Sequence, residues 1–351
     1  PAARRRLIAM TCSSVRRASW MSGASTNGWR SGTGRRAGPS PWHAYPGAHP
    51  SKVPSCNGSW PGVRSWTDLW QGWPRTSAGA RWPRWTSSRQ RCQAVGEPVW
   101  RLLGGRTHKT VPIYNTCAGY KHVRATQKNA LFERGEDWSL KAGDSNEGPY
   151  EDLLAWRYNA GDLARSLKSE GVGAMKIWPF DIAAEASNGT RISLADLDKA
   201  LEPFQKIRDA VGRDMEIMVE LHGLWTLPPV LRIAEALKAY DVAWLEEPIR
   251  YNEFDAMAEL ARHTSIPIAA SERLASRQMF KQLIDKRAAS VIMIDLAWCG
   301  GLSEARKIAN MAEASELPVT LHDCTGPIVY AASCALSATL PNVTDEEAVR
   351  A

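Results

Sequence analysis

Residues 242–272 read VAWLEEPIRYNEFDAMAELARHTSIPIAASE, and this stretch contains the repeating unit that decides the fold. Two short apolar runs, 242–245 and 266–271, flank a segment long enough for a helix, and each run leads to a glutamate, Glu246 or Glu272. A strand, a helix and a second strand in this order are typical of a parallel βαβ unit. We therefore expect both glutamates at the same end of a parallel sheet.

The same arrangement recurs on both sides of this stretch. Apolar runs also end at Glu220, Asp295 and His322, so that five polar side chains follow one another at intervals of 26, 26, 23 and 27 residues. Each interval fits one strand and one helix. In a closed parallel barrel the carboxyl ends of the strands open onto one face, where active sites of that architecture lie. The spacing predicts that the five side chains converge on one site.

Apolar runs and amphipathic segments alternate from Val111 onward. Seven strands are expected, and an eighth begins near Asn342 and is cut short by the end of the chain at Ala351. A polar stretch from Lys121 to about Gly148 interrupts the first unit. The expected strands are 111–114, 174–177, 216–221, 242–246, 266–271, 290–296 and 318–321. The expected helices are 159–170, 193–211, 228–240, 252–263, 276–285, 303–315 and 328–338.

This order of elements predicts an α/β fold, namely a (β/α) barrel of the TIM type that is incomplete at its eighth unit. An open, doubly wound sheet is the rival architecture. That architecture normally carries a glycine-rich phosphate-binding turn, GxGxxG, after an early strand. Such a turn follows none of the expected strands, so we favour the barrel.

The composition limits the class of protein. The 351 residues allow one or two domains, because a barrel of this type takes about 250 residues. No run of about 18 apolar residues offers a membrane span. The seven cysteines are scattered without a CxxC pair, which argues against a disulfide framework and a structural zinc site. Since no cleavable signal peptide is visible, we expect a soluble, cytoplasmic protein.

The N-terminal part differs in composition from the rest of the chain. Residues 1–100 contain 15 lysines and arginines against two acids, and nine of the sixteen tryptophans lie within residues 1–85. No sustained apolar face accompanies them. Because tryptophan has the single codon TGG, a shifted frame in GC-rich DNA can exchange leucine codons for tryptophan codons. We predict that residues 1–92 are translated out of frame and that the true frame resumes near Gly96.

Residues 1–95 are therefore expected to be irregular, and residues 96–351 to form the barrel. A genuine basic, Trp-rich domain is the alternative, and its charge would suggest a nucleic acid as partner. The segment carries no recognisable nucleic-acid-binding module, so we expect neither a nucleic acid nor a membrane as partner.

The three glutamates point to a metal ion. A single glutamate at the end of a strand is more often a helix cap, but Glu220, Glu246 and Glu272 come from consecutive units. Three neighbouring carboxylates repel one another unless a cation neutralises them. Oxygen-only ligation favours Mg²⁺ over zinc.

Several motifs together carry a family resemblance that runs from about Gly96 to the C-terminus. The chain resembles the mandelate racemase branch of the enolase superfamily in the order, spacing and flanks of these motifs. They are Glu246-Glu247-Pro248, Ser271-Glu272, Asp295 with Cys299-Gly300-Gly301, and Pro318-Val319-Thr320-Leu321-His322-Asp323.

The resemblance implies a β/α barrel in which Glu220, Glu246 and Glu272 hold Mg²⁺ and Glu247 has a structural role. The metal ion of this superfamily stabilises the enediolate that forms when a base removes the proton α to a carboxylate. His322 and Asp295 match the His/Asp dyad of the family. Residues 1–95 would then be a disordered or frameshifted remnant of the α+β capping domain.

The second strand departs from the family pattern. Where the branch often carries Lys-x-Lys, with its second lysine as a base, this chain has Lys176-Ile177-Trp178. Racemisation needs proton donors on both faces of the substrate and is therefore disfavoured. Lys176 is expected to act as a cation beside the substrate, and a snorkelled structural lysine is the alternative.

The third strand supports a dehydratase. His222 lies two residues after Glu220, which puts both side chains on the same side of a strand. In acid-sugar dehydratases similar to galactonate dehydratase, a histidine at this spacing protonates the departing hydroxyl, although the preceding ligand is usually aspartate. A structural histidine near the metal is the alternative.

The sequence therefore predicts a Mg²⁺-dependent hydro-lyase that converts a sugar acid, an aldonate or aldarate, to a 2-keto-3-deoxy acid. His322, Asp295, His222 and Lys176 are the expected catalytic residues. Glu347, on the expected eighth strand, is a candidate for the acid that hydrogen-bonds the enediolate in some members. A non-catalytic fragment and a racemase or epimerase of a 2-hydroxy acid are the alternatives. The resemblance also implies a homo-oligomer for the intact family member.

Overall fold

The computed structural model describes residue 92, residues 94–118 and residues 151–350. All of them belong to one compact unit, and the second unit, Ile8–Pro54, lies outside the described residues. The polar stretch at 121–148 and, apart from Cys92, the predicted out-of-frame segment 1–92 also lie outside the described residues, so both stay predictions. Within the region 1–95 that was expected to be irregular, residues 92, 94 and 95 are described, and they are helical.

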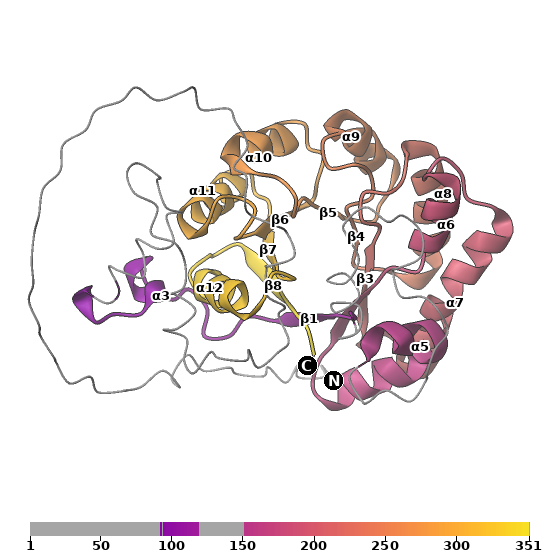
Figure 1. The fold of residues 1–351 in the computed structure, drawn as a ribbon, viewed down its shortest axis with the longest axis horizontal. Helices are drawn as coiled ribbons and strands as arrows, with labels where there is room; N and C mark the ends of the chain where they lie inside the picture. The colour runs from indigo at the N-terminus through magenta and orange to yellow at the C-terminus, as the bar shows by residue number, and fades with distance from the viewer. Residues whose placement is uncertain (1–91, 93, 119–150, 351) are drawn as a thin grey trace, which may run out of the picture. The chain divides into compact units, whose positions relative to one another are not determined.

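Eight parallel strands form a closed barrel in which each strand pairs with its neighbours in chain order and β1 pairs with β8 (Figure 1). The predicted TIM-type barrel is thus confirmed. The strands are β1 (Ile113–Thr116), β2 (Ala174–Ile177), β3 (Glu216–Glu220), β4 (Trp244–Glu246), β5 (Ile268–Ala270), β6 (Val291–Asp295), β7 (Val319–His322) and β8 (Val343–Ala348).

The eighth strand is as long as any other and joins the two ends of the sheet. It begins one residue after the predicted position and pairs with β7 and with β1, where Tyr114 is in register with Glu347. The sheet is therefore closed by a full strand at the position where the sequence predicts the eighth unit.

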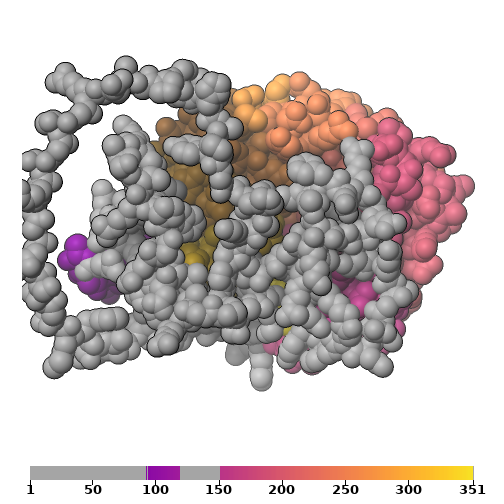
Figure 2. Space-filling view, viewed as in Figure 1, coloured from indigo at the N-terminus to yellow at the C-terminus, as the bar shows by residue number. Residues whose placement is uncertain are grey.

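Helices surround the barrel and give the continuous pink-to-orange surface from α7 to α10 in Figure 2. Within the described part of the chain, no helix is long and apolar enough to cross a membrane. The helices are α3 (Val99–Leu102), α5 (Asp152–Ser169), α6 (Asp181–Ser187), α7 (Leu194–Val211), α8 (Leu227–Leu237), α9 (Phe254–His263), α10 (Ser276–Asp285), α11 (Leu302–Glu313) and α12 (Pro327–Ser337).

Three helices differ from the sequence prediction, and one of them, the four-residue helix α3, was not expected. Helix α5 begins at Asp152 and is kinked at Asn159 (φ −132°, ψ 46°), so the predicted helix 159–170 is only its second segment. The short helix α6 was not predicted, because its seven residues are too few to show a helical period.

Alternation along the strands separates two apolar cores. On β3, Ile217 and Val219 point outward into the core between barrel and helices, whereas Met218 points into the barrel. The ring of Trp244 meets that of Tyr114 edge to face inside the barrel, with centroids 5.4 Å apart. The interior core consists of Tyr114, Ala174, Met218, Trp244, Ala269, Val291 and Met293.

Candidate active site

A polar layer lies directly above the interior apolar core at the carboxyl ends of the strands. Because inward side chains recur every second residue, Lys176 follows Ala174 into the barrel, and Glu220 follows Met218 in the same way. Glu246 follows Trp244 and Asp295 follows Met293 in the same manner. The polar layer, which includes Lys176, Glu220, Glu246 and Asp295, thus packs directly on the interior apolar core.

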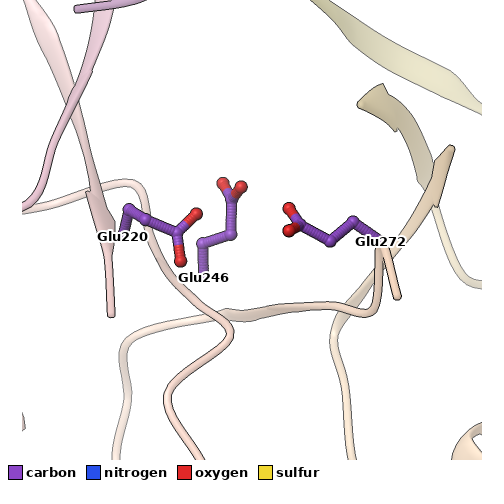
Figure 3. Close-up of side chains that lie close together, drawn as sticks. All are labelled: Glu220, Glu246 and Glu272. Atoms are coloured by element: carbon purple, nitrogen blue, oxygen red, sulfur yellow. The ribbon is translucent and has the colours of Figure 1, made fainter. Parts of the chain in front are cut away.

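Three carboxylates meet in this layer. Glu220 and Glu246 are the last residues of β3 and β4, in register with each other, and Glu272 follows β5 by two residues. One oxygen of each lies within 4.8 Å of the others, and all three residues are buried. Figure 3 shows the three side chains pointing toward one another. The predicted convergence of these glutamates is therefore present.

Hydrogen-bond donors fix the orientation of each carboxylate. Glu220 Oε1 accepts the backbone N–H groups of Leu221 at 3.0 Å and His222 at 2.5 Å, which leaves Oε2 for the centre. The indole N–H of Trp244 donates to Glu246 Oε2 at 3.1 Å. Arg273 Nε lies 3.5 Å from Glu272 Oε1. These contacts hold the three carboxylates in fixed orientations.

Burial makes this concentration of negative charge costly. It raises the pKa of Glu220 to about 7, with Lys176 opposing the shift and Glu272 adding to it. Burial likewise raises the pKa of Glu246 well above its ordinary value. Glu272 behaves differently, because His322 and Lys176 outweigh its burial and lower its pKa.

The donor set fits a hard divalent cation. All three candidate ligands are carboxylates, which suit Mg²⁺, and no histidine or cysteine belongs to the cluster. Lys176 contacts two of the three carboxylates, Glu220 and Glu246, and a divalent ion would offset the negative charge that remains on the cluster. The family-derived expectation of a metal site agrees with these residues.

Lys176 occupies the middle of the polar layer. Its ammonium group contacts Glu246, lies 2.9 Å from Glu347 Oε1 and 3.5 Å from Glu220 Oε2, and stands over the ring of Tyr114. The lysine is only 3% exposed, so it is not a snorkelled surface residue. The carboxylates raise the pKa of Lys176 well above its ordinary value, although burial acts in the opposite direction.

His322 and Asp295 form a buried pair on neighbouring strands. They are in register between β6 and β7, and His322 Nδ1 lies 2.9 Å from Asp295 Oδ2. The backbone N–H groups of Ala297 and Trp298 donate to Asp295 Oδ1 at 2.7 and 3.1 Å. The ring of Trp298 packs against His322 with centroids 5.3 Å apart. These contacts hold the imidazole in one orientation.

The other nitrogen of His322 faces the centre of the site. Nε2 lies 3.1 Å from Glu272 Oε2 and 3.7 Å from Glu347 Oε2. Burial lowers the pKa of His322, but Glu272, Glu347 and Asp295 raise it further, to well above its ordinary value. The imidazole is thus placed to exchange a proton with a molecule bound beside the carboxylates.

Glu347 is more central than its place on the last strand suggested. It receives Lys176 on one oxygen and the backbone N–H of Asp323, at 3.2 Å, on the other. Burial favours the neutral acid, yet Lys176 and His322 lower the pKa of Glu347 to about 2. The carboxylate therefore carries a negative charge at the centre of the site.

His222 lies at the edge of the polar layer. Strand β3 ends at Glu220, and His222 follows it with a left-handed backbone, φ 48°. Its Nδ1 lies 2.7 Å from Asp181 Oδ2, and its ring meets that of Trp178 edge to face, with centroids 5.7 Å apart. His222 is close enough to Glu272 to lower the pKa of that carboxylate, after the larger effects of burial, His322 and Lys176. The structure thus brings His222 near Glu272 from a loop, with its ring against Asp181 and Trp178.

Glu247 is buried but stands apart from the triad. It follows Glu246 with a left-handed backbone, φ 42°, and among the described residues neither carboxylate oxygen has a hydrogen-bond partner. Burial, reinforced by Glu272, raises the pKa of Glu247 to about 8. Among the described residues, the candidate metal site consists of the triad Glu220, Glu246 and Glu272 and does not include Glu247.

Comparison with known proteins places this geometry in a family. The family described as enolase C-terminal domain-like matches residues 159–351. D-galactonate dehydratase of Klebsiella pneumoniae is 35% identical over 241 residues, which cover 68% of this chain and 52% of that protein. Arabinonate dehydratase of Saccharolobus solfataricus is 31% identical, over 67% of this chain and 54% of that protein. The chain spans about half the length of these curated relatives.

Solved structures of the same group share the fold. An enolase of the mandelate racemase subgroup from Agrobacterium tumefaciens is 43% identical, with a TM-score of 0.61, and the match covers 74% of this chain and 60% of that chain. An enolase protein from environmental sequencing of the Sargasso Sea is 38% identical, with a TM-score of 0.62, over 75% of this chain and 61% of that chain.

Proposed function

The chain belongs to the enolase superfamily, in its mandelate racemase branch, and on this premise we propose that it dehydrates a sugar acid with the help of Mg²⁺. The two curated relatives are dehydratases of aldonates, which supports a substrate with a carboxylate and a β-hydroxyl group. The observation that carries the proposal is the presence of a buried carboxylate triad and two imidazoles at one barrel mouth.

Glu220, Glu246 and Glu272 are the proposed ligands of Mg²⁺. When bound, the ion would stabilise the negative charge that develops on the substrate carboxylate as the α-proton leaves. Lys176 lies beside the triad and would contact the same carboxylate group as a cation, while Glu347 holds the lysine from the other side.

His322 is the proposed base. Asp295 accepts the Nδ1 proton of the imidazole. Glu272 and Glu347 raise the pKa of His322, and a cation bound to Glu272 would offset this effect, so that neutral His322 could present the lone pair of Nε2 to the substrate. Nε2 takes the α-proton, and the electron pair of the C–H bond moves toward the carboxylate to give an enediolate. The contacts with Asp295 and Trp298 keep the ring in position during this step.

His222 is the proposed acid. As the enediolate collapses, the bond to the β-hydroxyl breaks and His222 delivers a proton, so that water departs. The enol that remains tautomerises to the 2-keto-3-deoxy acid. One molecule of substrate thus gives one molecule of product and one of water, with no change of oxidation state overall.

Incubation with a library of aldonates and aldarates in the presence of Mg²⁺ tests the proposal, with colorimetric detection of 2-keto-3-deoxy acids. We expect turnover of at least one acid and its loss in His322→Asn. If the folded protein turns over none of them, the proposal fails. Epimerisation of a 2-hydroxy acid without water loss would instead establish a racemase.

A further inference from the structure

Asp181 is a buried carboxylate that the proposed mechanism does not use. It is the first residue of α6, it is 2% exposed, and it was not a candidate in the sequence. Its Oδ2 lies 2.7 Å from His222 Nδ1, while its Oδ1 has no hydrogen-bond partner among the described residues. A buried carboxylate with a single polar contact costs free energy, so this contact needs an explanation.

Helix capping does not explain Asp181. Phe180 occupies the cap position of α6, and its side chain makes no capping hydrogen bond. The side chain of Asp181 reaches instead across to the loop after β3. The polar contact of the aspartate side chain is therefore with His222.

The backbone of the loop that carries His222 does not determine the orientation of the imidazole ring. Backbone hydrogen bonds from Leu221 to Glu246 at 3.0 Å and from Gly223 to Glu247 at 2.6 Å fix the main chain on either side. They do not fix the rotation of the ring. The ring is held by Trp178, which is 4% exposed, and by Asp181. Both residues belong to the connection between β2 and α6.

The arrangement repeats that of His322 on another side of the site. In each pair an aspartate Oδ2 contacts Nδ1, at 2.9 Å for His322 and 2.7 Å for His222, and a tryptophan packs against the ring. Because the aspartate contacts Nδ1 of each ring, Nε2 is the nitrogen that is directed away from the aspartate. In His322, this nitrogen faces Glu272 of the triad.

We propose that Asp181 is a positioning residue that orients the ring of His222 so that Nε2 faces the departing hydroxyl. This role rests on the proposed dehydratase function. Asp181 itself does not touch the substrate. The connection Trp178-Pro179-Phe180-Asp181 thereby supplies two of the contacts that hold the proposed acid.

Two rates measured by proton NMR in D₂O separate this role from a structural one. Deuterium entry at the α-carbon of recovered substrate reports proton removal by His322, and 2-keto-3-deoxy acid reports elimination. In Asp181→Ala we expect elimination to fall about 10- to 100-fold while α-exchange persists, because only the acid is misplaced. Asp181→Asn, which keeps an oxygen at this position, should lie between this variant and the wild type.

Asp152→Asn is a matched control. Asp152 is also a buried aspartate at the start of a helix, but it contacts Arg350 and Asn115 and not His222. The ratio of exchange to elimination should stay at the wild-type value in this variant. An equal loss of both rates in Asp181→Ala, or a loss of neither, would overturn the positioning role.

A spectrum of the ¹⁵N-labelled protein decides the matter even if no sugar acid is turned over. The imidazole signals of His222 are assigned by their absence in His222→Asn. We expect the hydrogen-bonded Nδ1 proton in the wild type and in Asp181→Asn, and its loss in Asp181→Ala. An unchanged His222 spectrum in Asp181→Ala would contradict the proposal, independently of the enzymatic function.

Discussion

The two histidine–aspartate pairs at the barrel mouth differ in what holds them. His322 and Asp295 stand on adjacent strands in register, both buried, so the sheet itself sets their distance. His222 and Asp181 come from a loop and from a short helix, and the side chain of His222 is 19% exposed. The sheet fixes the positions of two side chains on paired strands. Side chains on a loop and a short helix depend instead on contacts with neighbouring side chains for their positions.

This difference suggests different duties. The buried pair of His322 and Asp295 lies against Glu272 and Glu347. It suits removal of the α-proton, the step in which negative charge develops on the substrate. The more exposed pair suits the release of a water molecule. Substitutions in and around the two pairs should therefore differ in the size and selectivity of their effects, and His322 should show the largest.

His322→Asn should have the largest effect on the reaction. Because this imidazole is the proposed base, both α-exchange and elimination should fall by about 10³- to 10⁴-fold. The NMR assay in D₂O measures both rates on one sample. If α-exchange survives in this variant, another group removes the proton and the two pairs have been assigned the wrong way round.

Lys176→Met tests the charge network that Lys176 forms with the carboxylates beside His322. Removing the lysine leaves several carboxylates buried without their shared cation, so stability in EDTA should fall by about 3–5 kcal/mol. Added Mg²⁺ should restore part of this loss, since it binds the folded state. Urea unfolding followed by circular dichroism measures both quantities.

Lys168→Met is the matched control for that experiment. Lys168 pairs with Asp214 at 2.6 Å, but both side chains are about half exposed, 46% and 58%. An exposed pair contributes only about 0–1 kcal/mol. Equal losses of stability in the two lysine variants would show that the buried network does not support the fold.

His222→Asn should have a smaller and more selective effect. Elimination should fall by about 10²-fold, because the departing hydroxyl loses its acid, while α-exchange continues. The ratio of the two rates is the measurement. A parallel loss of both would remove the functional distinction between the two pairs.

Trp298→Phe should have the smallest effect. Trp298 is 39% exposed, and phenylalanine keeps an aromatic ring against His322. An aromatic contact contributes about 0.5–1.5 kcal/mol, so the catalytic rate should change by less than about tenfold. Steady-state kinetics measures it. A loss as large as that of His322→Asn would mean that Trp298 does more than support the ring.

The sequence predicted the strand-borne half of the site well. Glu220, Glu246, Asp295 and His322 end apolar runs, and the inward side of a strand recurs with period two, so their convergence could be inferred from spacing. The barrel followed from the same regularity. The eighth strand was expected in the right place but cut short by the end of the chain, whereas Val343–Ala348 form a full strand.

The loop-borne half could not be inferred in this way. The sequence suggested His222 by its distance from Glu220, but the chain turns after β3, and the ring is placed by Asp181 and Trp178. Asp181 lies 41 residues away on a helix too short to predict. The contact of Lys176 with Glu347 likewise joins β2 to β8, which only the closed barrel brings together.

Titration calorimetry with Mg²⁺ tests the central claim, a cation site on the triad, most directly. Glu216 and Glu220 stand at opposite ends of β3, so Glu216→Gln and Glu220→Gln form a matched pair. We predict one Mg²⁺ per chain in the wild type and in Glu216→Gln, and its loss in Glu220→Gln. No binding by the folded wild type, or equal binding by both variants, would contradict the account.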